Sequence, residues 1–100
     1  MEKVVVLFNA PEFTANDYDM VWDELRAAGQ SNPKGLISHV GFAGPEGGWM
    51  VVDVWESENA FNEFGKILMP IIQKIGVPVP PPRILPAHYV LVQQPEGEPA

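Results

Sequence analysis

The stretch Gly48–Ser57, with the sequence GWMVVDVWES, decides the fold that we predict for this chain. It is rich in valine and aromatic residues, which favour β-strands, and apolar side chains occupy both of its faces. Asp53 is the only acidic residue between Trp49 and Trp55. An acid in a strand that is covered on two sides is paired, faces a wet cavity or takes part in chemistry. The sequence therefore predicts a pocket beside Asp53.

The segments before this strand predict a strand, a helix and a second strand. The β-branched and aromatic run Lys3–Asn9 is typical of a strand. Thr14 and Asp17 form an imperfect capping box for a helix that Gly29 ends. Gly35–Ala43 alternates as a strand does, and a glycine-rich turn joins it to the next strand as a hairpin.

The segments after this strand predict a long helix and a final strand. Ser57 caps the helix and Gly76 ends it. Pro70 lies inside this helix, and because proline lacks the amide hydrogen we expect a kink or a break near Met69. The apolar positions of Arg83–Val92 predict the last strand.

The predicted element order is β-α-β-β-α-β, the split βαβ arrangement of ferredoxin-like folds. This α+β fold has a four-stranded antiparallel sheet with two helices on one face. One hundred residues suffice for one small core, so we predict a single domain over residues 1–92. The polar segment 93–100 predicts a flexible C-terminal tail.

The second face of the sheet also needs a cover, because the segments Val4–Phe8 and Trp49–Trp55 are apolar at nearly every position. Two helices can cover only one face. The simplest cover for the other face is the same face of another copy, so the sequence predicts a closed homodimer whose sheets face each other.

The alternation of side chains predicts the register of the hairpin and the content of each face. The expected pairs are Phe42 with Met50, Val40 with Val52, His39 with Asp53, and Ile37 with Trp55. The face expected to lie under the helices contains Leu36, Val40, Phe42, Met50, Val52 and Val54. The face expected to lie away from the helices contains Ile37, His39, Trp49, Val51, Asp53 and Trp55.

The composition predicts a soluble acidic protein that binds neither nucleic acid nor membranes. The net charge of −7 repels phosphate backbones and anionic lipids, and the six basic residues are scattered singly. No segment is long enough to span a bilayer, and the run Val4–Phe8 is too short for the core of a signal peptide. The chain has no cysteine, which excludes disulfides and thiolate chemistry and fits a cytoplasmic location.

His39 and Asp53 are the strongest candidates for chemistry in the sequence. A carboxylate beside an imidazole fixes its tautomer and raises its basicity, as proton abstraction from an acidic carbon or a phenol requires. A cross-strand pair of this kind also satisfies two half-buried polar groups, so a purely structural role is an equal alternative. His88 lies on the predicted last strand, where it faces the same interior or belongs to the rim or core.

Other kinds of site have less support. His39, His88 and Asp53 could form a facial metal set, but they come from three strands with no local ligand spacing, and we expect neither metal nor cofactor. The serines lie in no nucleophile motif, and the turn 44–48 matches no phosphate-binding fingerprint. The tryptophans are either core residues or platforms that stack a flat ligand.

Nearly the whole chain resembles the dimeric α/β-barrel superfamily, in particular small uncharacterised proteins similar to antibiotic-biosynthesis-monooxygenase domains. The resemblance rests on the element order, on the run Gly47–Ser57 followed by Ala60 and Phe61, and on His39 upstream of it. It implies a barrel-like dimer with a cavity between sheet and helices for flat aromatic or polyketide-like molecules. Some members oxygenate such molecules without metal or flavin, through the carbanion of the substrate itself.

The resemblance also implies roles for single residues. Characterised relatives use an asparagine on the first strand and a tryptophan near the end of the third, and Asn9 and Trp55 stand in similar places here. Haem-degrading relatives need a histidine on the second helix, and residues 58–75 contain none. Haem oxygenation is therefore not expected, while other branches are isomerases, dehydratases and stress-response proteins.

Three classes of function stay open on the sequence alone. A cofactor-independent monooxygenase would use the candidate catalytic residues Asn9, His39, Asp53, Trp55 and His88. A non-catalytic protein that binds a small aromatic ligand needs only the cavity and its lining. A structural or partner-binding dimer needs neither, because its interior would be filled.

Overall fold

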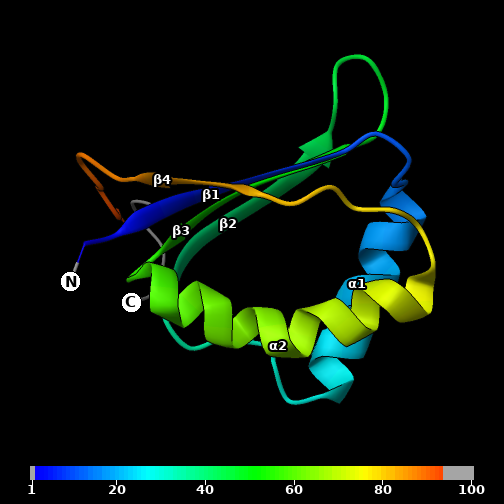
Figure 1. Ribbon diagram of the computed structural model, residues 1–100, viewed down its shortest axis with the longest axis horizontal. Helices are drawn as coiled ribbons and strands as arrows, with labels where there is room; N and C mark the ends of the chain where they lie inside the picture. Colours follow the sequence, from blue (N-terminus) through cyan, green and yellow to red (C-terminus); the bar gives the residue numbers. More distant parts are fainter. Residues whose placement is uncertain (1, 94–100) are drawn as a thin grey trace.

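The computed structural model describes residues 2–93, and it has the predicted α+β architecture. Four antiparallel strands form one sheet in the order β2-β3-β1-β4, and both helices lie on the same face of it (Figure 1). The ferredoxin-like arrangement is therefore confirmed. The elements are β1 (Val4–Ala10), α1 (Ala15–Ala27), β2 (Leu36–Ala43), β3 (Trp49–Trp55), α2 (Glu58–Ile75) and β4 (Arg83–Pro86).

The two central strands carry the core. β3 pairs with β1 on one side and with β2 on the other, so its backbone donors and acceptors are satisfied along both edges. Val6 and Trp55 are completely buried where the helices cross the sheet. Leu25 of α1 is 1% exposed and closes the core from the helix side.

Both helices begin where the sequence predicts. The amide of Asp17 donates to the Thr14 hydroxyl at 3.1 Å, and the Thr14 amide donates to the Asp17 carboxylate at 2.9 Å, which completes the capping box. The Ser57 hydroxyl accepts from the amide of Ala60 at 3.0 Å at the start of α2. Three of the amides that the two helix starts leave without a helical partner, those of Thr14, Asp17 and Ala60, are satisfied in this way.

Helix α2 runs through Pro70 as one element, so of the kink or break expected near Met69 the break is wrong. The proline removes one helical hydrogen bond, but the buried side chains Phe61, Phe64 and Leu68 anchor the helix to the sheet before it. Partly buried Ile71 packs against the same core after it. Packing of the apolar stripe therefore outweighs the local loss.

The register of the hairpin is confirmed for His39 with Asp53, Val40 with Val52 and Phe42 with Met50. The pairing of Ile37 with Trp55 is wrong. A bulge between Leu36 and Ser38 shifts the register, so that Leu36 opposes Trp55.

The two faces of the sheet are the reverse of the prediction except at Leu36, which lies under the helices as predicted because the bulge shifts the register there. Trp55 points at the helices, where its ring centroid lies 5.7 Å from that of Phe61 and 5.1 Å from that of Phe64. His39 and Asp53 share its face. The opposite face, which we call the outer face, is formed by Val5, Leu7, Val40, Phe42, Met50, Val52 and Val54. Turning the largest aromatic side chains toward the helices buries more apolar area, and this decides the orientation.

The last strand is shorter than predicted. β4 ends at Pro86, and its four residues pair with Val4–Leu7 of β1. His88 lies in a bend beyond the strand and is exposed. Of the predicted flexible tail at 93–100, residues 94–100 lie outside the described residues.

Gly48 at the end of the hairpin turn has a backbone that no other residue fits without strain. Its φ is +76°, and a Cβ there would lie 2.7 Å from Cα of Pro11 and 2.8 Å from the carbonyl oxygen of Ala10. Gly47 also has a positive φ, +96°, but a Cβ there would meet nothing within 4 Å. The two glycines share the backbone strain and differ in the clash.

Replacing Gly48 with alanine is expected to cost more stability than replacing Gly47. Gly47→Ala should lower the free energy of unfolding by about 1 kcal/mol, from the positive φ alone. Gly48→Ala should cost a further 1–3 kcal/mol or so, because backbone atoms of the β1 end must move. Urea unfolding of both variants measures the difference, and equal midpoints would contradict the clash.

Candidate functional site

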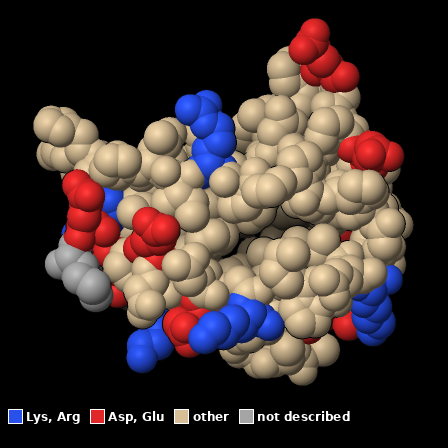
Figure 2. Space-filling view, viewed as in Figure 1, with Lys and Arg blue, Asp and Glu red and all other residues tan. Residues whose placement is uncertain are grey.

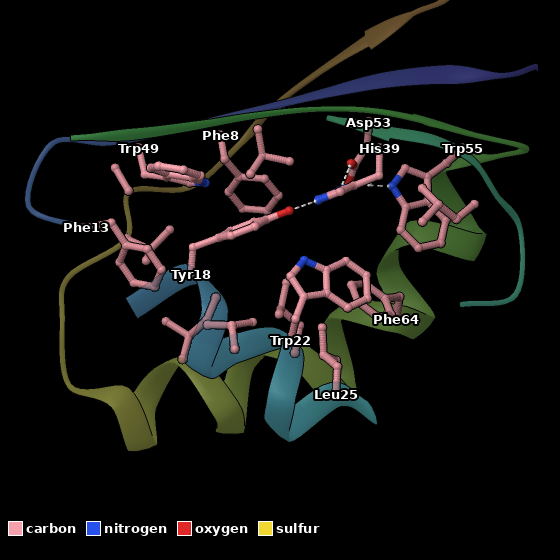
Figure 3. Close-up of a pocket in the computed structure, with 17 residues that line it drawn as sticks. Phe8, Phe13, Tyr18, Trp22, Leu25, His39, Trp49, Asp53, Trp55 and Phe64 are labelled. Carbon is pink, nitrogen blue, oxygen red and sulfur yellow. Dashed lines mark hydrogen bonds and ion pairs between the residues drawn. The ribbon is translucent and has the colours of Figure 1, made fainter. Parts of the chain in front are cut away.

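A cavity lies between the inner face of the sheet and the two helices (Figure 3). Its volume is about 80 Å³, and apart from three polar side chains, Tyr18, His39 and Asp53, its walls are apolar or aromatic. The labelled aromatic side chains in Figure 3 come from β1, β3 and both helices as well as from the loop before α1. They are Phe8, Phe13, Tyr18, Trp22, Trp49, Trp55 and Phe64.

His39 and Asp53 meet across β2 and β3 in the wall of this cavity. The His39 Nδ1 atom lies 2.5 Å from Oδ1 of Asp53, and the indole N–H of Trp55 donates to Oδ2 of Asp53 at 3.1 Å. Asp53 is only 4% exposed, so water does not solvate its carboxylate. The hydrogen bonds from His39 and Trp55 give each carboxylate oxygen a protein donor instead. An ionised carboxylate only accepts hydrogen bonds, so Nδ1 carries the proton and Nε2 of neutral His39 is the basic atom.

Tyr18 of α1 is the polar residue of the site that sequence reasoning missed. Its hydroxyl lies 2.5 Å from Nε2 of His39, and the phenol and imidazole rings are nearly parallel, with 4° between their planes. With His39 neutral, the phenol donates to Nε2. Asp53, His39 and Tyr18 therefore form one hydrogen-bonded chain from β3 through β2 to α1 (Figure 3).

The absence of a side chain at Gly41 leaves the space that the Tyr18 phenol occupies. Gly41 lies two residues after His39 on β2, and a Cβ there would be 2.6 Å from the Tyr18 oxygen. This glycine was the available signal in the sequence. A residue without a side chain on the same strand face as His39 indicates that another group fills the space.

The environment of Tyr18 keeps its phenol neutral. Burial raises the pKa of Tyr18 above its ordinary value of 10.0, and the negative charges of Asp53 and Asp19 act in the same direction against an opposing hydrogen bond from Trp22. The folded state therefore holds this proton more tightly than the unfolded state does. The stability gained from the neutral phenol is intact below pH 10 and is lost as the pH rises through the folded-state pKa.

We expect Tyr18 to ionise above its ordinary pKa of 10.0 in the folded protein. Tyr18 and Tyr89 are the only tyrosines, so the ultraviolet absorbance of tyrosinate in a Tyr89→Phe variant follows Tyr18 alone. The same variant in concentrated urea is the control, with a midpoint of about 10. A folded midpoint at or below the urea value would contradict the burial of this phenol.

Two tryptophans pack against the hydrogen-bonded chain of Asp53, His39 and Tyr18. Trp22 meets the His39 ring edge-on, with centroids 5.2 Å apart, and Trp49 lies 5.0 Å from the Tyr18 ring. The indole nitrogen of Trp49 is buried without a hydrogen-bond partner. A buried N–H without a partner in a cavity wall suits a ligand that brings an acceptor, such as a carbonyl oxygen.

The structure brings together three of the five candidate catalytic residues. His39, Asp53 and Trp55 line the cavity, but Asn9 and His88 do not. Asn9 opposes Met50, which places it among the outer-face residues, and it is exposed. The position on β1 that resembled the asparagine of known relatives is therefore on the wrong face for this cavity.

His88 also lies apart, because β4 ends before it. Within residues 2–93, no group of three histidine, cysteine or acidic side chains is close enough to hold a metal ion. His39, His88 and Asp53 are thus not assembled as a facial metal set. The expectation that His88 lies on the last strand is wrong.

Charged side chains are dispersed over the surface (Figure 2). Most basic groups on this face stand near acidic ones, one stands apart, and a hollow opens between the sheet and the helices. Exposed ion pairs join Arg26 to Asp23, Lys66 to Glu63 and Lys74 to Glu24. No basic stripe of the kind that tracks a phosphate backbone runs over the face shown. In the described part of the chain, neither helix combines the length and hydrophobicity of a bilayer span.

Comparison with known proteins places the fold. No protein-family model matches the sequence, and no curated protein matches it either. Solved structures do match. SnoaB from Streptomyces nogalater, a cofactor-independent oxygenase solved as a single-residue variant, superposes with a TM-score of 0.66 over 93% of this chain and 100% of that one, at 14% identity.

A second similar structure is the monooxygenase ActVA-Orf6 of Streptomyces coelicolor in complex with nanaomycin D. It has a TM-score of 0.57 and 17% identity and covers 95% of this chain and 93% of that one. This chain has the antibiotic-biosynthesis-monooxygenase-like fold. A conserved protein from Methanosarcina mazei has the same fold, with a TM-score of 0.56, 11% identity, and coverage of 84% and 91%. The resemblance stated from the sequence is confirmed at the level of the fold.

Proposed function

We propose that this protein is a cofactor-independent monooxygenase that acts on a flat aromatic or polyketide-like substrate. One observation carries the proposal: a histidine whose Nδ1 is bonded to a buried carboxylate lies in the wall of an aromatic cavity. Two structures with this fold are an oxygenase described as cofactor-independent and a monooxygenase in complex with nanaomycin D. Their printed activities support the proposed reaction class, and the His39–Asp53 pair is the proposed base.

The chemistry needs a base and a dry cavity. His39 accepts a proton from an acidic C–H or O–H of the substrate, and the resulting carbanion or phenolate reacts with molecular oxygen. One oxygen atom stays on the product, and the other leaves as water with the two hydrogens that the substrate loses. Asp53 stabilises the imidazolium that forms, as a buried carboxylate does in other histidine-based sites. The aromatic lining stacks the substrate, and the free Trp49 N–H suits a carbonyl acceptor on it.

The cavity has to enlarge for such a substrate. About 80 Å³ is well below the roughly 300 Å³ at which ligand pockets usually begin. Tyr18 and Trp22, both from α1, are half-buried and project into the site from the helix side (Figure 3). Rotation of the Trp22 side chain, which leaves the hydrogen bond between Tyr18 and His39 in place, is the smallest change that makes room.

Oxygen consumption across a panel of anthrone-like and quinol compounds tests the proposal. The wild-type protein should consume oxygen with at least one of them, faster than buffer. Trp55→Phe removes the second donor to Asp53 while keeping an aromatic ring, and Asp53→Asn removes the carboxylate. Equal rates for the wild-type protein and both variants would remove these residues from the mechanism.

A non-catalytic binding protein is the second candidate, and one observation favours it. The basic Nε2 atom of His39 is already bonded to Tyr18, so no substrate reaches it directly in this arrangement. Such a protein would bind the same compounds, quench tryptophan fluorescence and leave the rate of oxygen consumption at that of buffer.

We further propose that the protein is a homodimer whose outer faces pack together. Val40 is 56% exposed and Phe42 36% exposed on this face, beside the partly exposed Met50 and Val52. A sheet face this apolar is typical of an interface, and a twofold axis covers both copies at once. A cytoplasmic location also stays a prediction, which cell fractionation can check.

A charge on the outer face should separate the dimer. Val40→Lys places an ammonium group in the proposed interface, and we expect the molar mass in light scattering to fall from twice the chain mass of 11.0 kDa to once. Met69→Lys is the matched control, because Met69 is 51% exposed on α2 and lies outside the sheet. A monomeric wild-type protein, or an unchanged mass for Val40→Lys, would contradict the dimer.

A further inference from the structure

The histidine of the candidate site does not present its basic atom to the cavity. Nε2 of His39 lies 2.5 Å from the Tyr18 hydroxyl, and Trp22 meets the imidazole edge-on from the helix side. A substrate in the cavity therefore meets the oxygen of Tyr18 before it meets His39. The phenol donates its proton to Nε2 and its oxygen has two lone pairs, so one lone pair remains to accept a hydrogen bond from a substrate beside the bond from Trp22.

We propose that Tyr18 is a catalytic residue that relays the substrate proton to His39, which extends the proposed monooxygenase function. The acidic proton of the substrate passes to the Tyr18 oxygen while the Tyr18 proton passes to Nε2 of His39. The electron pair of the broken C–H or O–H bond stays on the substrate as an enolate or phenolate. Tyr18 ends neutral, and His39 ends as an imidazolium paired with Asp53.

The donors and acceptors of the hydrogen bonds between Asp53, His39 and Tyr18 support this direction of proton transfer. Asp53 accepts from both His39 and Trp55, so it holds Nδ1 protonated and leaves Nε2 as the acceptor for the phenol. Because the phenol stays neutral at working pH, it always has a proton to give as it takes one. The two transfers are coupled along hydrogen bonds that already exist in the structure, so no side chain has to move for the proton to reach His39.

Gly41 provides a way to move Tyr18 without removing its hydroxyl. A methyl group at Gly41 would lie 2.6 Å from the phenol oxygen and 2.6 Å from the ring carbon that bears it. The phenol is the mobile end of a side chain, so it would shift away from His39 while the strand stays in place. Gly41 has no positive φ, so alanine suits its backbone.

Proton exchange without oxygen tests the relay apart from oxygenation. An anthrone-like substrate is incubated with the protein in heavy water under nitrogen, and exchange at its acidic carbon is followed by NMR. We expect Tyr18→Phe and Gly41→Ala each to slow exchange by about 10²-fold or more, as His39→Asn does. Tyr89→Phe, which removes an 80% exposed phenol, should leave the rate unchanged.

The outcomes separate the relay from the proposed function. Exchange in Tyr18→Phe at the wild-type rate or faster, with His39→Asn inactive, would overturn the relay and make Tyr18 a plug over a direct base. A wild-type protein that exchanges the proton but consumes no oxygen would overturn the monooxygenase and keep the relay. A wild-type protein that does neither would overturn both.

A measurement without substrate checks which nitrogen of His39 carries the proton in the resting protein. In a His88→Gln variant the remaining histidine is His39, and nitrogen NMR reports which ring nitrogen carries the proton. We expect the proton on Nδ1, and a shift of the Nε2 resonance when Tyr18→Phe or Gly41→Ala is added. A proton on Nε2 of the neutral ring would overturn the relay, since that nitrogen could not then accept from the phenol.

Discussion

Asp53→Asn is expected to lower the rate of substrate deprotonation and of oxygen consumption by about 10²- to 10⁴-fold. The carboxylate holds the His39 proton on Nδ1, across 2.5 Å, and balances the imidazolium charge once the substrate proton arrives. The neutral amide of asparagine cannot balance the charge of the His39 imidazolium. Its NH₂ group can also donate to Nδ1, which would move the ring proton to Nε2 and remove the acceptor that Tyr18 needs.

The lower rate of Asp53→Asn has to be distinguished from an effect of unfolding. Asparagine has nearly the shape of aspartate, and its carbonyl oxygen can still accept from the Trp55 indole, so the core should keep its packing. Urea unfolding and circular dichroism check this. Asp23→Asn is the matched control, because Asp23 is exposed and pairs only with Arg26. A rate for Asp53→Asn within about twofold of wild type would contradict the proposed base.

The element order and the helix starts could be predicted because they depend on local signals. The capping box at Thr14 and Asp17 needs only neighbouring residues, and so does the cap at Ser57. The pairing of His39 with Asp53 followed from the length of one turn and from strict alternation. These inferences never needed the position of a helix relative to the sheet.

The orientation of the sheet could not be predicted in the same way. Alternation says which residues share a face, but both faces of β3 are apolar, so the pattern does not say which one the helices take. The chain buries Trp55 against α2, and His39 and Asp53 follow it inward because they share that face. Asn9 goes outward by the same rule, since its partner Met50 alternates with Trp49 and Val51 of the inner face.

The contact between Tyr18 and His39 also lay beyond the sequence pattern. Its two residues are 21 positions apart on different elements, and their meeting depends on how α1 crosses β2. The helical spacing of Tyr18, Val21, Trp22 and Leu25 indicates only that Tyr18 is on the apolar face of α1. Gly41 carried the remaining information, because its missing side chain makes the space into which the phenol fits.

The second large effect is expected on stability, from Trp55→Ala. Trp55 is fully buried, packs on Phe61 and Phe64, and donates to Asp53. Truncation of a buried tryptophan costs about 3–5 kcal/mol through the lost burial and the cavity that remains. Small domains have about 5–15 kcal/mol in total, so this single change should remove between roughly a fifth and all of the unfolding free energy.

Trp55→Phe divides this loss into its two physical causes. Phenylalanine keeps an aromatic ring against Phe61 and Phe64 but has no N–H, so it leaves one oxygen of the buried Asp53 without a donor. We expect a cost of about 1–3 kcal/mol from that unpaired oxygen, smaller than the loss in Trp55→Ala. Urea unfolding at one protein concentration measures both, because association also contributes to the apparent stability.

Met69→Ala, at an exposed position of α2, should change the unfolding free energy by less than about 0.5 kcal/mol. A loss for Trp55→Ala as small as that of Met69→Ala would mean that Trp55 does not hold the helices to the sheet, and the cavity beside it would lose its structural basis.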